Sequence, residues 1–345
     1  MDRRLPALLS FLMLLLAQSS QLTAVFAADE PSSFSKAVTA YKDHQLEEAL
    51  ARAKEAVRQE PGHVDAYVLL GELYYLKQEM GKARQNWEQA LKLAPSRQDV
   101  RQRLEKLKEE EPLEGGLARS DTYPFVVRFA QEEMPVDLGA LRGLLRDTYR
   151  LVGQQFEYFP DHSITVILYP ATDFEQIKGA SHRVAGMYDG KIRLPLTKTK
   201  PGKPIPASVE LQRVLWHEYT HALVYDLAKG NCPIWLNEGL ATLEESRVQA
   251  LSMKEFQEAF REGTILRWTD LWKQEYDSSR LILLYQQSHM VTRYLVKRWG
   301  WSGMVRVLKN LGRGYPLEDA FRAEDKSAPA TIEADWLSWL RRNGV

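Results

Sequence analysis

The sequence predicts an α+β, mostly helical fold, in which α-helical repeats precede a domain with a small mixed sheet, an H-E-x-x-H helix and further C-terminal helices. Three observations support this prediction. Small residues recur with a 34-residue period between positions 37 and 95. Runs of β-branched residues and turn residues alternate between positions 125 and 196. Long stretches with helical periodicity follow from position 208 to 340.

The composition of the chain excludes some partners. Its 345 residues are enough for two domains. The 46 Lys and Arg residues balance the 46 Asp and Glu residues, so bulk charge favours no nucleic-acid partner and no anionic membrane. A single cysteine excludes an internal disulfide framework.

The N-terminus has the pattern of a secretory signal peptide, predicted here as residues 1–27. Arg3 and Arg4 precede an apolar run over 8–17, and Val25-Phe26-Ala27 supplies a small-residue cleavage site. The run is shorter than the ~20 residues of a membrane span, although an uncleaved anchor is the alternative. We therefore expect a periplasmic or secreted mature protein, with no stable membrane span.

Residues 34–110 carry a repeat with a period of 34 residues, which is the period and pattern of tetratricopeptide repeats. The last part, 97–110, has the polar outer face that a capping helix needs. Such repeats offer a surface to a peptide or partner protein, or act as a spacer or stabilising appendage; both interpretations stay open. The matching positions are Ala37, Ala49, Ala56 and Pro61 in the first copy and Gly71, Ala83, Ala90 and Pro95 in the second.

A linker is expected over 111–124, which contains Pro112 and Gly115-Gly116. The remaining residues, 125–345, form the second predicted domain. Its first part is expected to contain strands, a helix and a hairpin that turns at Asp189-Gly190. In chain order these elements are a strand over 125–129, a helix over 136–158, a strand over 163–169 and the hairpin over 186–196.

The helix after this hairpin carries His217-Glu218-Tyr219-Thr220-His221. Ser208 is positioned to cap its start. Two His four residues apart lie on one helix face, so both imidazoles can reach one tetrahedral Zn²⁺. Glu218 follows the first histidine, where it can take a proton from a zinc-bound water.

A zinc hydrolase needs a third protein ligand. A third His six residues past the second is excluded, because that position is Leu227. Glu238 fits instead, because the turn over 229–233 lets a second helix fold back beside the first. Gly239 and Ala241 are small enough for the two helices to approach closely around a metal.

The H-E-x-x-H helix followed by a short turn and P-x-W-L-N-E-G-L-A resembles the gluzincin branch of zinc peptidases, specifically the peptidase MA-like family. The resemblance covers roughly 125–340, and its specific part is 217–241. It implies a zinc-dependent metallopeptidase, with the metal ligands His217, His221 and Glu238 and the general base Glu218.

The same resemblance suggests a group that stabilises the oxyanion. Family members carry a tyrosine followed by a serine three residues on, which is similar to Tyr285 and Ser288 on the helix predicted over 281–299. We expect Tyr285 in this role; His289, one turn further, is the alternative. Both are otherwise core groups.

Two other residues lie near the motif. Glu245 is about two turns past Glu238 and is a candidate for orienting a ligand, but we expect it on a solvated face. Cys232 lies between the two motif helices. Its thiolate is a candidate fourth ligand that would keep the enzyme latent, although an inert thiol is commoner.

The sequence therefore predicts a zinc metallopeptidase that acts on a peptide or protein substrate, and a further protein partner bound by the repeats is one of the two open interpretations of the repeats. One alternative is an interaction protein in which the zinc site is inactive or structural. Another is a zinc hydrolase of a non-peptide or cell-wall amide. Deletion of the repeats is expected to separate the first two, because hydrolysis of a small peptide should survive if the repeats only recruit.

Overall fold

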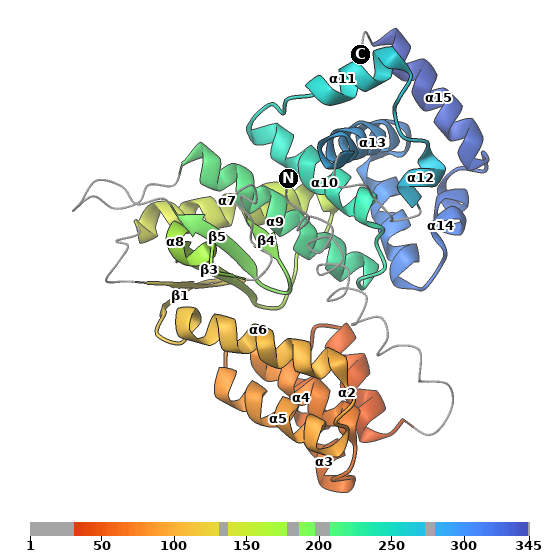
Figure 1. Ribbon diagram of the computed structural model, residues 1–345. Helices are drawn as coiled ribbons and strands as arrows, with labels where there is room; N and C mark the ends of the chain where they lie inside the picture. The colour runs from red at the N-terminus through yellow and green to blue at the C-terminus, as the bar shows by residue number, and fades with distance from the viewer. Residues whose placement is uncertain (1–30, 131–136, 178–185, 197–207, 273–279, 344–345) are drawn as a thin grey trace. The chain divides into compact units, whose positions relative to one another are not determined.

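The computed structural model describes residues 31–130, 137–177, 186–196, 208–272 and 280–343 (Figure 1). The expected signal peptide, 1–27, lies outside the described residues. The chain forms two compact units. The first, here called the repeat–sheet unit, contains the described residues up to 130 and those of 161–196. The second, the helical unit, contains 137–160 and 208–343.

The repeat–sheet unit begins with antiparallel helices whose small residues are buried, as the repeat predicts. Ala49 and Ala83 have no exposed surface. The indole of Trp87 lies over Gly71, where an added Cβ would come within 2.2 Å of the ring. This contact explains a glycine inside a helix, although the identification as tetratricopeptide repeats stays a prediction. The helices are α2 (Ser33–Lys42), α3 (Leu46–Gln59), α4 (Val64–Leu76), α5 (Met80–Leu93) and α6 (Gln98–Glu114).

The linker expected over 111–124 is largely regular structure. Helix α6 continues past Pro112 to Glu114, and strand β1 (Ala118–Thr122) starts three residues after Gly115. Glu114 is buried and pairs with Lys191 and Arg193. These ion pairs hold the last turn of α6, so a composition typical of a loop does not produce one here.

The sheet of this unit has five strands in the order β1-β2-β3-β5-β4. The central strands β2, β3 and β5 are parallel, whereas β1 and β4 pair with their neighbours in the antiparallel direction. The predicted hairpin is confirmed, and Gly190 in its turn has a φ of 95°. The strand bounds are β2 (Phe125–Phe129), β3 (Ile164–Pro170), β4 (Met187–Tyr188) and β5 (Ile192–Leu196), with the short helix α8 (Ala171–Phe174) after β3.

The helical unit consists of helices packed around α9 and α13, and it completes the predicted α+β, mostly helical fold. Helix α13 bends at Gly300, whose φ is 70° and ψ 172°. In the part of the chain that the structure describes, none of the helices combines the length and apolarity needed to cross a membrane. The helices are α7 (Leu138–Phe156), α9 (Val209–Ala228), α10 (Ile234–Val248), α11 (Lys254–Glu262), α12 (Trp268–Trp272), α13 (Leu281–Gly312), α14 (Leu317–Glu324) and α15 (Pro329–Arg342).

Gly239 has a different role from the one expected. A Cβ at this position would lie 2.1 Å from Thr292 Oγ1 and 2.6 Å from the Ser288 carbonyl oxygen. Both atoms belong to α13. The glycine therefore allows α10 to pack closely against α13, and the expectation that it serves the contact between the two motif helices is wrong.

Candidate metal centre

Helix α9 begins and ends where the sequence predicts, and α10 begins directly after the predicted turn. Ser208 caps α9, because its Oγ accepts a hydrogen bond from the Leu211 N–H at 3.1 Å. The helix ends with Lys229 in the left-handed conformation, and Pro233 stands just before α10. The short connection brings α10 back beside α9.

This arrangement brings the three predicted ligands together. His217 Nε2 and His221 Nε2 are 3.1 Å apart. Glu238 Oε2 lies 3.6 Å from the first and 3.8 Å from the second. Their ligand atoms fall within 4.8 Å of one another, so one ion can contact all three.

The other nitrogen of each imidazole binds an oxygen acceptor. His217 Nδ1 donates to Glu245 Oε2 at 2.8 Å, and His221 Nδ1 donates to Asn237 Oδ1 at 2.9 Å. Glu245 is 6% exposed and also pairs with Arg213. The expectation of a solvated face for Glu245 is therefore wrong.

These hydrogen bonds determine what the site can bind. A neutral imidazole that carries its proton on Nδ1 has a lone pair on Nε2. Two such lone pairs and a carboxylate oxygen converge here, and an electron-rich arrangement of this kind is suited to a cation. Two imidazoles and one carboxylate are a donor set that fits Zn²⁺, and Nδ1 acceptors are the usual partners of metal-binding histidines.

The charges of the three groups shift their pKa values accordingly. Burial favours the neutral form of Glu238, but His221 and His217 outweigh it and lower the pKa of the carboxyl. Burial lowers the pKa of His221. For His217, Glu238 and Glu218 outweigh burial and leave the pKa raised. Glu238 thus acts on both imidazoles in the direction that favours a positive charge.

Glu218 and Tyr285 border the same centre. Glu218 is 5% exposed. The pKa of Tyr285 is raised well above its ordinary value, first by the charge of Glu238, then by burial and by Glu218. The Tyr285 hydroxyl therefore keeps its proton and can donate a hydrogen bond, and the charges of Glu238 and Glu218 act on it.

His289 has a different environment. Burial, followed by the charge of Arg293, lowers its pKa to about 4, and the backbone of Thr242 acts in the opposite direction. Neither Glu218 nor Glu238 is among the groups that shift it. The charges of Glu218 and Glu238 therefore act on Tyr285 and are not among the causes of the pKa shift of His289.

Cys232 does not join the cluster of the three ligands. The structure brings together the two histidines and Glu238 without it, among the described residues. Burial raises the pKa of its thiol, and Sγ donates to the Pro233 carbonyl oxygen at 3.6 Å. Among the described residues, the structure thus gives no support to a latent state in which this thiolate binds the zinc.

Sequence reasoning assigned no role to Arg213 and Asn237. Arg213 lies four residues before His217 on α9, so helical spacing already places the two on one face. Asn237 directly precedes Glu238, the third predicted ligand. Its hydrogen bond with His221 can be recognised only once the fold is known. Asn237 accepts a hydrogen bond from His221, and Arg213 pairs with the carboxylate that accepts one from His217.

Comparison with known proteins adds one match. Residues 206–342, which extend from α9 to α15, match the family model of the Peptidase MA superfamily. The match supports a peptidase-type enzyme. Members of this superfamily are usually metal dependent. No curated protein matches the chain.

Proposed function

We propose that the protein is a zinc-dependent metallopeptidase of the gluzincin type, which is secreted or periplasmic and hydrolyses peptide bonds. The observation that carries the proposal is the convergence of His217 Nε2, His221 Nε2 and Glu238 Oε2, with both Nδ1 atoms bound to acceptors. The superfamily match over the same helices supports it.

The three ligands would hold the zinc ion, which when bound supplies a Lewis acid for a water molecule and for the substrate carbonyl. Glu218 is a buried carboxylate beside the first ligand, so it is placed to accept the proton of the attacking water. It then returns this proton to the nitrogen of the leaving amine. The amide bond breaks with no net change in the protonation of Glu218.

Tyr285 would stabilise the negative charge that develops on the oxygen of the substrate carbonyl. Its raised pKa keeps the hydroxyl protonated, so it can donate a hydrogen bond to the oxygen of the former carbonyl. Glu245 and Asn237 fix the orientation of the two imidazoles and, through their acceptor oxygens, the tautomer.

Zinc content and turnover test the proposal separately. We expect purified mature protein to bind one zinc ion per chain, and His221→Ala and Glu238→Ala to lose it. Glu218→Gln should keep the zinc and lose hydrolysis of a dye-labelled unfolded protein. Unchanged turnover in Glu218→Gln would exclude it as the general base, and wild-type zinc affinity in both ligand variants would refute the metal centre.

A further inference from the structure

The repeat–sheet unit contains a second group of ionisable side chains that the proposed reaction does not use. Six charges, here called the ionic cluster, lie between helix α6 and the hairpin formed by β4 and β5. None of the six side chains is more than 9% exposed. Helix α6 contributes Lys106, Glu110 and Glu114, and the hairpin contributes Asp189, Lys191 and Arg193.

Arg193 lies at the centre of the ionic cluster. Its Nη2 is 3.0 Å from Glu110 Oε1, its Nε is 3.2 Å from Asp189 Oδ1, and its Nη1 pairs with Glu114. Nη2 also donates to Tyr75 Oη at 2.7 Å. One guanidinium of the sheet thus binds two carboxylates of α6 and a hydroxyl of α4.

The two lysines bind across the same boundary. Lys191 Nζ lies 3.3 Å from Glu114 Oε2 and 3.4 Å from the centre of the Tyr75 ring. Lys106 pairs with Asp189 of the hairpin and lies 3.6 Å from Glu110. The ionic cluster therefore contains three positively and three negatively charged side chains, so its formal charges cancel.

This balance requires both elements. Each hairpin charge has an opposite charge on α6, and without it a buried ion would be left uncompensated, which is strongly unfavourable. Neither the helices nor the sheet can bury its half of the cluster alone.

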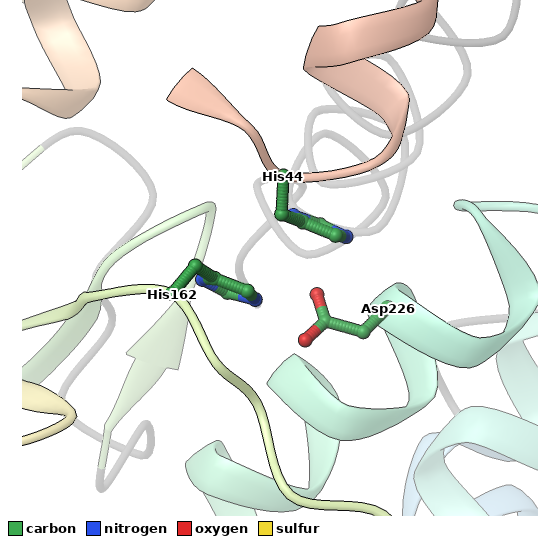
Figure 2. Close-up of side chains that lie close together, drawn as sticks. All are labelled: His44, His162 and Asp226. Carbon is green, nitrogen blue, oxygen red and sulfur yellow. The ribbon is translucent and has the colours of Figure 1, made fainter. Parts of the chain in front are cut away.

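Two further contacts join the repeat helices to the sheet. His44, between α2 and α3, stacks on His162, just before β3, with ring centroids 4.3 Å apart and planes 14° apart (Figure 2). A Cβ at Gly190 would lie 3.1 Å from Leu76 Cδ2 of α4. Asp226, also labelled in Figure 2, belongs to the helical unit, where it accepts a hydrogen bond from Tyr158 Oη at 3.2 Å.

We infer that helices α2–α6 and the sheet fold as one cooperative unit, in which the face of α4 and α6 bearing Tyr75, Lys106 and Glu110 has the β4–β5 hairpin of the same chain as its partner. The repeats then support the hairpin, and this face is not a docking surface for another protein. The inference is independent of the zinc centre.

Lysine labelling tests whether the face is covered. Full-length wild-type protein is treated with an amine-reactive acylating reagent, and the modified residues are quantified by mass spectrometry over time. Lys106 and Lys191 should react at least about tenfold more slowly than Lys108, which is exposed on the same helix. Smaller protection of either lysine would overturn the inference.

Hydrogen exchange tests whether the unit is cooperative. Leu50→Ala removes a buried side chain of α3 and should speed exchange of the β5 amides as well as those of α3. Leu93→Ala, the same change at a position of α5 that is 39% exposed, should leave β5 unchanged. If Leu50→Ala does not fold, Ala53→Gly is the milder variant. Faster exchange in the repeats with wild-type exchange in β5 would refute cooperativity.

Discussion

The hydrogen bond from His217 to Glu245 predicts a measurable share of the zinc affinity. The Nδ1–Oε2 distance is 2.8 Å, and Arg213 binds the other carboxylate oxygen. A hydrogen bond to a charged group contributes about 1.5–3 kcal/mol, and about 1.4 kcal/mol corresponds to tenfold in affinity. Loss of this acceptor should therefore weaken zinc binding by about 10–100-fold, the range found for groups that orient metal ligands.

A series at this position separates charge from hydrogen bonding. Glu245→Gln keeps an acceptor oxygen and should weaken zinc binding by about tenfold. Glu245→Ala removes the acceptor and should weaken zinc binding by about 100-fold. The assay is competition for zinc against a chromogenic chelator. Glu244→Gln is the matched control, because Glu244 is the neighbouring buried carboxylate but pairs with Arg247 and not with a zinc-site histidine.

Activity at different zinc concentrations distinguishes positioning from misfolding. If Glu245 acts by orienting His217, excess zinc should restore most of the activity of Glu245→Ala. Zinc affinity within about twofold of wild type in that variant would refute the role derived from the Nδ1 contact.

Three further predictions concern other residues. Tyr285→Phe should lower kcat by about 10²–10³-fold without changing zinc content, as loss of an oxyanion donor does; kcat within a few-fold of wild type would exclude this role. Gly239→Ala should lower the free energy of unfolding by about 1–3 kcal/mol, because the added methyl group overpacks the contact with α13. Gly143→Ala is the control and should not destabilise the protein, because an added Cβ there meets nothing within 4 Å. Thermal unfolding compares the two variants. Burial opposes ionisation of Glu114, but Lys191 and Arg193 outweigh it and lower its pKa from 4.5 to about 2. Its contribution to stability is thus complete above about pH 4.5 and is lost as the pH falls through about 2. The difference in unfolding free energy between wild type and Glu114→Gln should shrink over that window, and a constant difference would contradict the assignment.

Local spacing explains why the convergence of His217, His221 and Glu238 could be predicted from the sequence. His217 and His221 are one helical turn apart, and a helix fixes their common face without knowledge of the fold. Glu238 needed only one additional assumption, a turn that reverses the chain, and Lys229 with Gly230 provides it. Helical spacing and turn chemistry therefore account for the proximity of these three side chains, and their role as zinc ligands stays a prediction.

The predictions that failed depend on partners distant in the sequence. Glu114 and Arg193 are 79 positions apart, and no local pattern reveals that they pair. The composition of 111–124 therefore predicted a loop where α6 continues. Gly239 was correctly expected to allow a close helix contact, but the partner helix, α13, starts more than 40 positions later, and spacing within the motif favoured α9.

The ionic cluster also changes how the role of the repeats can be tested. Deletion of the repeats was expected to separate a recruiting module from an essential one. A deletion through α6 removes Lys106, Glu110 and Glu114 and leaves Asp189, Lys191 and Arg193 of the hairpin without their partners. Breaking one buried ion pair costs about 3–5 kcal/mol, against a total stability of about 5–15 kcal/mol for a typical domain. The truncated sheet should therefore unfold, and a loss of hydrolysis after deletion would not identify recruitment. Substitutions on the exposed surface of α3 and α5, made in the full-length chain, keep the cluster intact and test recruitment alone.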